Sequence, residues 1–165
     1  MPTPPINVLF LCTGNSARSI LSEALLNDLA SEQGKPWLGW SAGSHPSGQP
    51  HPDGLKELQK RGHQTAQYRS KSWDEFNEND APEMDIIVTV CDNAANETCP
   101  AFPGKGLRVH WPAPDPAHIE PLEARQIAFS DVYDLCKARI TALLSLSDEA
   151  LDDREKVQAI AEIQA

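Results

Sequence analysis

The stretch Val8–Ser19, which reads VLFLCTGNSARS, joins an apolar run to a polar loop and then to a helical pattern. The run Ile6–Cys12 has the length and composition of a fully buried strand. From Ala17 to about Gln33, apolar residues recur on one face of a helix. The loop between these two elements is therefore predicted to lie at the carboxyl end of a strand and the amino end of a helix.

Short apolar runs and helical patterns continue to alternate along the chain. Strands are predicted at Trp37–Ser41, Asp85–Cys91 and Leu107–His110, and helices at Pro52–Arg61 and Glu123–Leu146. This order predicts an α/β fold in three layers, with a parallel sheet between two layers of helices. Ligands of such sheets bind at the carboxyl ends of the strands. Cys12, Cys91 and the loop after His110 can therefore share one site.

The length of 165 residues fits one compact domain, which we place at residues 1–146. The acidic tail 147–165 is expected to be a surface helix or a frayed end without chemistry. Nucleic acid is not expected as a partner, because the net charge is −10 and affinity for polyanions comes from Lys and Arg. The apolar run Val8–Cys12 is too short for a signal peptide or a membrane span. We therefore expect a cytoplasmic protein without a membrane partner.

In the cytoplasm, cysteines are more often catalytic, redox-active or buried than disulfide-bonded. Cys12 is followed by five residues and then Arg18. A loop of this length can curl around a tetrahedral oxyanion with its N–H groups inward, and the following helix adds the positive end of its dipole. Gly14 is expected to supply a left-handed turn. The predicted oxyanion-binding residues are Thr13, Gly14, Asn15, Ser16, Ala17, Arg18 and Ser19.

Within this loop, Cys12 is expected to lie beneath the anion as a thiolate nucleophile, with the Ser19 hydroxyl donating to its sulfur. The guanidinium of Arg18 can bond two anion oxygens at once. The alternative is a buried structural cysteine near a helix-capping serine. The specific spacing from Cys12 to Arg18 disfavours that alternative.

These residues resemble the start of the low-molecular-weight protein tyrosine phosphatase superfamily, and within it the thioredoxin-coupled arsenate reductases. Further matches are Thr89–Asp92 with Cys99-Pro100, His110-Trp111 with Asp115–Ala117, and Ser41–Ser44. The resemblance covers roughly Asn7–Leu144. It implies a four-stranded parallel sheet and the reduction of arsenate to arsenite, with phosphate or sulfate as analogues of the substrate.

The resemblance also implies a relay among three cysteines. Cys12 attacks arsenic, Cys91 then attacks Cys12, and Cys99 attacks Cys91. A Cys91–Cys99 bridge needs Cα atoms within about 7 Å, so the loop Asp92–Thr98 is expected to rearrange on oxidation. No bound cofactor is implied. The expected reductant is an external thiol system, which is thioredoxin, glutaredoxin or a low-molecular-weight thiol. An incidental cysteine pair and a zinc site with His110 are the alternatives, although the short ligand spacing of a zinc site is missing.

The Pro-rich loop after the last predicted strand carries Asp115 between two prolines. This loop can hold the carboxyl group over Cys12 as a general acid, whereas a lone Asp beside Pro is more often a turn former. Phosphatases of the superfamily usually have tyrosines just after this Asp-Pro, and here Ala117 and His118 stand instead. That difference disfavours a tyrosine phosphatase.

Asn15 and Glu23 are expected to support the anion loop from behind. Some reductases of the family bind potassium near these positions, but here Lys71 stands where a cation ligand is expected, and no metal is predicted. Either the Lys71 ammonium takes the place of the ion beside Glu23, or Lys71 is a solvated surface residue. Cys136 is expected to be a small core residue. No role is predicted for His45, His51, His63 or His118.

Three function classes are consistent with these patterns. The first is an arsenate reductase and the second is a phosphomonoesterase. The third is a redox or oxyanion sensor that forms the same disulfides without turnover. Multiple turnover of arsenate with a reductant separates the reductase from the sensor.

Overall fold

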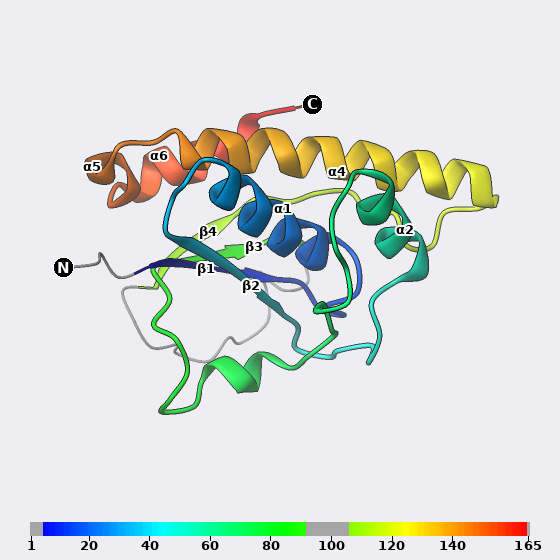
Figure 1. Cartoon of the computed structure of the whole chain (residues 1–165), viewed down its shortest axis with the longest axis horizontal. Helices are drawn as coiled ribbons and strands as arrows, with labels where there is room; N and C mark the ends of the chain where they lie inside the picture. Colours follow the sequence, from blue (N-terminus) through cyan, green and yellow to red (C-terminus); the bar gives the residue numbers. More distant parts are fainter. Residues whose placement is uncertain (1–4, 92–105, 165) are drawn as a thin grey trace.

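The computed structural model describes residues 5–91 and 106–164. Its centre is a four-stranded sheet in the order β2-β1-β3-β4 (Figure 1). The strands are β1 Ile6–Leu11, β2 Trp37–Ala42, β3 Ile86–Thr89 and β4 Leu107–His110. Every pair of neighbouring strands is parallel. The predicted α/β fold with a four-stranded parallel sheet is therefore confirmed.

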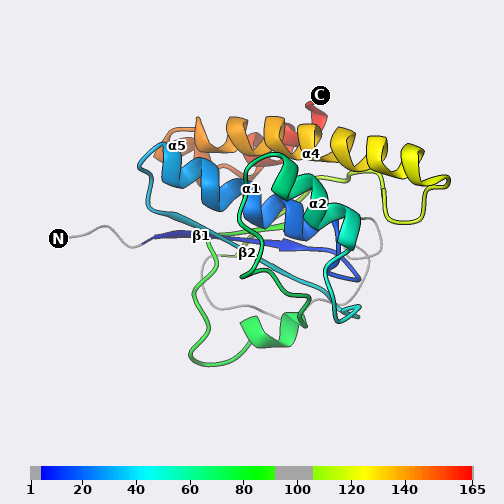
Figure 2. The same ribbon diagram turned by 45° about the vertical axis from the view of Figure 1, so that its right-hand side comes forward.

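Among the described residues, the three longest helices lie on one face of the sheet, and a single-turn helix lies on the other (Figures 1 and 2). The three are α1 Arg18–Glu32, α2 Pro52–Lys60 and α4 Leu122–Leu144, and the single turn is η1 Trp73–Phe76. The chain then forms α5 Asp148–Leu151, α6 Arg154–Ala159 and η2 Ile160–Glu162. No helix in the described part of the chain is both long and apolar enough to cross a bilayer.

The central strand β1 is buried on both of its faces. Val8 and Phe10 belong to the core under the long helices, whereas Leu9 and Leu11 belong to a second core with Phe76. Successive side chains of a strand point to opposite faces, so a strand with a core on each side reads as a continuous apolar run. The uninterrupted VLFL of the sequence reflects this position. Its carboxyl end delivers Cys12 to the edge of the sheet where the site forms.

The segment after residue 146 packs along α4 and β4. Val157 and Ile160 are buried in the main core. The Gln158 side chain accepts a hydrogen bond from His110 N at 2.8 Å and donates one to His110 O at 2.6 Å. Because β4 is an edge strand, Gln158 engages backbone groups that a further strand would otherwise use. These apolar and polar contacts tie the acidic segment to the sheet.

Candidate active site

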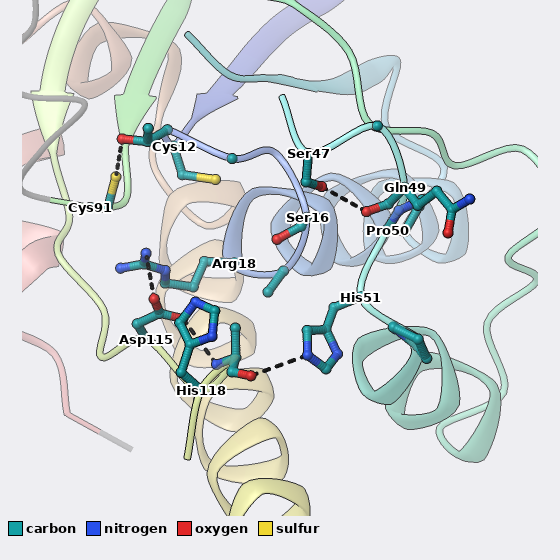
Figure 3. A pocket seen from close by; sticks show the side chains of 16 residues that line it. Cys12, Ser16, Arg18, Ser47, Gln49, Pro50, His51, Cys91, Asp115 and His118 are labelled. Carbon is teal, nitrogen blue, oxygen red and sulfur yellow. Dashed lines mark hydrogen bonds and ion pairs between the residues drawn. The ribbon is translucent and has the colours of Figure 1, made fainter. Parts of the chain in front are cut away.

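A cavity of about 730 Å³ opens at the carboxyl ends of β1 and β3 (Figure 3). The structure brings together at this cavity four of the five predicted catalytic residues, namely Cys12, Arg18, Cys91 and Asp115. The fifth, Cys99, lies outside the described residues, as does the loop 92–98, for which the sequence predicts a rearrangement on oxidation. The anion loop, residues 13–18, forms one wall, and residues 47–52, which lead into α2, form another.

The anion loop is held from its outer side by the segment that follows β2. Three backbone N–H groups of that segment donate to loop carbonyls: His45 to Thr13 at 2.9 Å, Ser47 to Gly14 at 2.9 Å, and His51 to Ser16 at 2.8 Å. In a planar trans peptide the N–H points opposite to the C=O. The N–H groups that follow these carbonyls therefore point away from the outer segment. This orientation is that of an anion-binding nest.

The left-handed residue of the loop is Asn15, with a φ of 43°, and the prediction that Gly14 makes this turn is wrong. Asn is one of the few residues with a side chain that adopt this conformation readily. Its amide is fully buried and bonded at both ends: Oδ1 accepts from Lys71 N at 2.8 Å, and Nδ2 donates to Ser19 Oγ at 2.9 Å. These two bonds hold the backbone of Asn15 in place.

The sulfur of Cys12 lies 3.0 Å from Ser19 Oγ, and Cys12 is only 4% exposed. Ser19 Oγ already accepts a hydrogen bond from Asn15 Nδ2, so its own hydroxyl proton is available for a hydrogen bond to the sulfur. The first turn of α1, which begins at Arg18, also directs its N–H groups toward this end of β1. A thiolate at Cys12 has both a hydrogen-bond donor and the positive end of a helix beside it.

Arg18 and Asp115 lie side by side at one edge of the cavity (Figure 3). Arg18 Nη2 lies 3.6 Å from Asp115 Oδ2, and Arg18 Nη1 donates to Ala113 O at 3.0 Å. Asp115 Oδ1 accepts from Ala117 N at 3.0 Å, and the Asp115 side chain is 44% exposed. The loop 112–117 thus carries a carboxyl group at the rim of the cavity, beside the guanidinium that would hold the anion.

Cys91 follows β3 and lines the same cavity as Cys12. Its sulfur lies 3.7 Å from Thr13 Oγ1, and Cys12 and Cys91 are both thiols in this structure. Cys136, on α4, is buried away from the cavity lining, as predicted for a core residue. Burial raises the pKa of the Cys136 thiol, which accepts a hydrogen bond from Ser22 Oγ at 3.6 Å.

Behind the anion loop lies a buried ion pair. Lys71 is 7% exposed, and its Nζ lies 3.7 Å from Glu23 Oε1, 3.4 Å from Ser41 Oγ and 3.0 Å from Arg69 O. Lys71 is therefore not a solvated surface residue. Its ammonium stands among these oxygens, so the residues present do not fit a bound monovalent cation.

Burial opposes the charge on both members of this pair. Burial raises the pKa of Glu23, although the Lys71 charge and the Ser41 hydroxyl, which donates to Glu23, offset part of the rise. Burial likewise lowers the pKa of Lys71, and the charge of Glu23 offsets part of that shift. Each charge is stabilised by the other.

Two residues at the site were given no role from the sequence. Gly43 lies directly against the outer side of the anion loop, and His51 contacts both the anion loop and Ala117. A histidine immediately before Pro52 at a helix start is a cue for a capping role, which His51 fills. Its second partner, Ala117, is 66 residues away, and no local pattern reveals such a contact.

Known proteins resemble this chain over most of its length. An arsenate reductase of Halalkalibacterium halodurans is 34% identical over 139 residues, which are 81% of this chain and 91% of the relative. The crystal structure of an arsenate reductase from Archaeoglobus fulgidus is 29% identical with a TM-score of 0.59, covering 81% of this chain and 98% of that one. A thioredoxin-dependent arsenate reductase of Corynebacterium glutamicum, 24% identical, has the same fold with a TM-score of 0.60 over 87% of this chain and 62% of that one.

The family match covers the whole site. Residues 7–158 match the family described as low molecular weight phosphotyrosine protein phosphatase, and this range includes every residue of the cavity lining. The resemblance seen in the stretch Val8–Ser19 is confirmed by this match. The chain belongs to the low molecular weight phosphotyrosine protein phosphatase family.

Proposed function

We propose that this protein is an arsenate reductase that converts arsenate to arsenite by a thiol–disulfide relay and serves arsenic detoxification. The observation that carries the proposal is that a second thiol, Cys91, lines the cavity of the nucleophile Cys12. A phosphatase needs one nucleophile and an acid, whereas a reductase needs thiols that supply two electrons. Relatives named arsenate reductase, 34% and 33% identical to this chain, support the same activity.

In the first step, arsenate binds to the N–H groups of the anion loop and to the fork of Arg18. The Cys12 thiolate attacks arsenic and forms a sulfur–arsenic bond. One arsenate oxygen leaves, and Asp115 supplies the proton with which it departs as water. The 3.6 Å separation of Asp115 Oδ2 from Arg18 Nη2 supports this role, because it places the acid beside the clamp on the anion.

In the second step, the Cys91 thiolate attacks Cys12 Sγ. The sulfur–arsenic bond breaks and its electron pair stays on arsenic, so that As(V) becomes As(III) and arsenite leaves. The two cysteines have together lost two electrons and are now joined as a Cys12–Cys91 disulfide. Cys99, whose role comes from the resemblance, then attacks Cys91 Sγ and releases the Cys12 thiolate. An external dithiol such as thioredoxin or glutaredoxin reduces the Cys91–Cys99 disulfide and is itself oxidised.

The composition of the cavity lining favours a small oxyanion over a phosphotyrosine. None of the described residues that line it is Phe, Tyr or Trp, and Ala117 and His118 occupy the rim beside Asp115. Among the described lining residues, an aryl group bound there would find no Phe, Tyr or Trp ring to pack against. Arsenate, or phosphate and sulfate as analogues, needs only the loop and Arg18. The reducing cytoplasm is the compartment in which such a relay is recharged.

The test is arsenate-dependent NADPH oxidation in the presence of thioredoxin and thioredoxin reductase, repeated with a glutaredoxin system. Multiple turnover by the wild-type protein, retained in Cys136→Ser and lost in Cys91→Ser, is the expected result. Hydrolysis of aryl phosphates without arsenate turnover would assign a phosphatase instead. Disulfide formation without turnover in either system would assign a sensor.

A further inference from the structure

We propose that His51 is a positioning residue that joins the anion loop to the loop carrying the general acid; this inference rests on the proposed function. The backbone N–H of His51 donates to Ser16 O at 2.8 Å. Its ring Nε2 lies 3.2 Å from Ala117 O, across the cavity rim (Figure 3). One residue therefore fixes the separation between the loop that binds the anion and the loop that protonates the leaving oxygen.

The start of α2 fixes the proton position on the His51 ring. Ring Nδ1 accepts a hydrogen bond from Asp53 N at 3.1 Å and so caps the helix. A backbone N–H can only donate, so Nδ1 carries a lone pair and the proton of the neutral ring is on Nε2. That proton is the one that Nε2 donates to Ala117 O. The helix cap therefore selects the tautomer that the acid loop requires.

Packing fixes the orientation of the same ring. The His51 ring lies against Phe129 of α4, with ring centroids 5.0 Å apart and planes inclined by 44°. The side chain is 22% exposed, so it is only partly open to the cavity. A ring held by packing, by the helix cap and by its own backbone can impose a position on the loop that it contacts.

From Ala117 the contact continues to the acid. Ala117 N donates to Asp115 Oδ1 at 3.0 Å, and Asp115 Oδ2 faces Arg18 at 3.6 Å. The bond from Arg18 to Ala113 O anchors the acid loop at its start, and the bond from His51 anchors it beyond the acid. Without His51 the loop keeps its bonds at Pro112 and Ala113, which precede the acid, but loses the bond at Ala117 that follows it. Asp115 then loses its fixed reach to the leaving oxygen. A displacement of about 1 Å at a reacting group can lower a rate by roughly 100-fold.

The experiment separates the cap from the loop contact. His51→Asn keeps a preferred N-cap residue on α2 but is too short to reach Ala117. His51→Gln carries an amide N–H that can approach Ala117. We expect His51→Asn to keep the melting temperature of the wild type, to lower kcat for arsenate about 10-fold or more, and to leave KM within about twofold. His51→Gln should recover part of the lost kcat.

A double-mutant cycle with Asp115→Asn is the decisive measurement. If His51 acts through Asp115, His51→Asn has no further effect on kcat in the Asp115→Asn background. An equal loss of kcat in both backgrounds, or no loss in the wild-type background, overturns the proposal. Should His51→Asn fail to fold, the same cycle is run with His51→Ser, which also keeps a preferred N-cap residue and is too short to reach Ala117.

The same cycle with phenyl phosphate keeps this inference separate from the proposed function. Its phenolate leaving group also needs a proton, so hydrolysis reports on Asp115 without arsenic chemistry. Failure of the wild type to reduce arsenate, combined with the non-additive pattern in phenyl phosphate hydrolysis, rejects the reductase and retains the role of His51. Additive losses with both substrates reject the role of His51 alone.

Discussion

Gly43 lies so close to Thr13 that a Cβ atom at Gly43 would meet Thr13 O at 2.4 Å and Cys12 O at 2.7 Å. Real Cβ atoms do not approach carbonyl oxygens to such distances. Gly43 cannot move aside, because its N–H donates to Lys71 O at 3.0 Å and its carbonyl accepts from Trp73 N at 2.9 Å. The end of β2 therefore sets how far outward the anion loop can lie.

Gly43→Ala is expected to displace the anion loop and to weaken oxyanion binding about 10-fold or more, because forcing atoms into a packed site typically costs about 1–3 kcal/mol. Inhibition by phosphate and isothermal titration with arsenate measure the loss. Gly14→Ala is the matched control for folding. Its Cβ would meet only Ser16 Oγ, at 3.7 Å, and Gly14 has no positive φ. Equal losses of thermal stability in the two variants would contradict this account of Gly43.

Cys12→Ser is expected to abolish arsenate reduction and any aryl phosphate hydrolysis together, because one thiolate serves both reactions. Arg18→Ala should come close to the same result. Arg18→Lys keeps the charge but loses the planar fork, and a fall of about 100-fold or more in kcat/KM is expected. Steady-state assays on arsenate and phenyl phosphate test all three variants. Wild-type rates in Cys12→Ser would refute the mechanism.

If electrons pass from Cys91 and Cys99 to arsenic, replacing each of these cysteines by Ser should stop the reaction at a different stage. Cys91→Ser should release no arsenite, because nothing attacks the Cys12 sulfur. Cys99→Ser should release about one arsenite per enzyme and stop as a Cys12–Cys91 disulfide. Cys136→Ser should turn over normally, since Cys136 is buried outside the cavity lining. Single-turnover arsenite measurements and mass spectrometry of the trapped disulfide distinguish these stages, and an essential Cys136 with a dispensable Cys99 would reverse the assignment.

Local patterns predict most of this fold and the anion loop. The apolar run before Cys12 marks a strand with a core on both faces. The loop, Arg18 and the helix then follow in the order expected of an oxyanion-binding loop. The failure at Gly14 has a physical cause. Glycine is the residue usually expected at a left-handed turn. Here Asn15 is held in that conformation by two side-chain hydrogen bonds, one with Lys71 N, which is distant in the sequence, and one with Ser19 Oγ on α1.

Polar side chains with distant partners are what the sequence patterns miss. His51 forms a hydrogen bond with Ala117, 66 positions along the chain, and Gln158 forms one with His110, 48 positions away. Hydrophobic periodicity predicts which face of a helix or strand is buried, but it does not predict which polar atoms form hydrogen bonds with each other. For the same reason, the sequence alone is consistent with both alternatives for Lys71, an ion pair with Glu23 and a solvated surface position. Only the folded chain brings Lys71 to Glu23.

The last prediction concerns this ion pair. Lys71→Met leaves Glu23 buried without the ammonium that lowers its pKa, so its folded-state pKa rises further above the ordinary value of 4.5. A carboxyl group with a raised folded pKa stabilises the fold at pH below its unfolded pKa, and this stability is lost as pH rises through the folded pKa. Lys71→Met should therefore be near wild-type stability at acidic pH and lose up to about 3–5 kcal/mol as Glu23 ionises.

Glu23→Gln should show the opposite dependence on pH. It removes the charge that sustains buried Lys71, so the folded-state pKa of Lys71 falls further below its ordinary value of 10.5. The stability associated with a lowered pKa is present above the unfolded value and is lost as pH falls through the folded one. The double variant has no buried titrating group at this position, and its stability relative to wild type should vary least with pH. Urea denaturation of the three variants at pH 5, 7 and 9 measures these slopes. Parallel slopes for Lys71→Met and Glu23→Gln would mean that the two charges do not depend on each other.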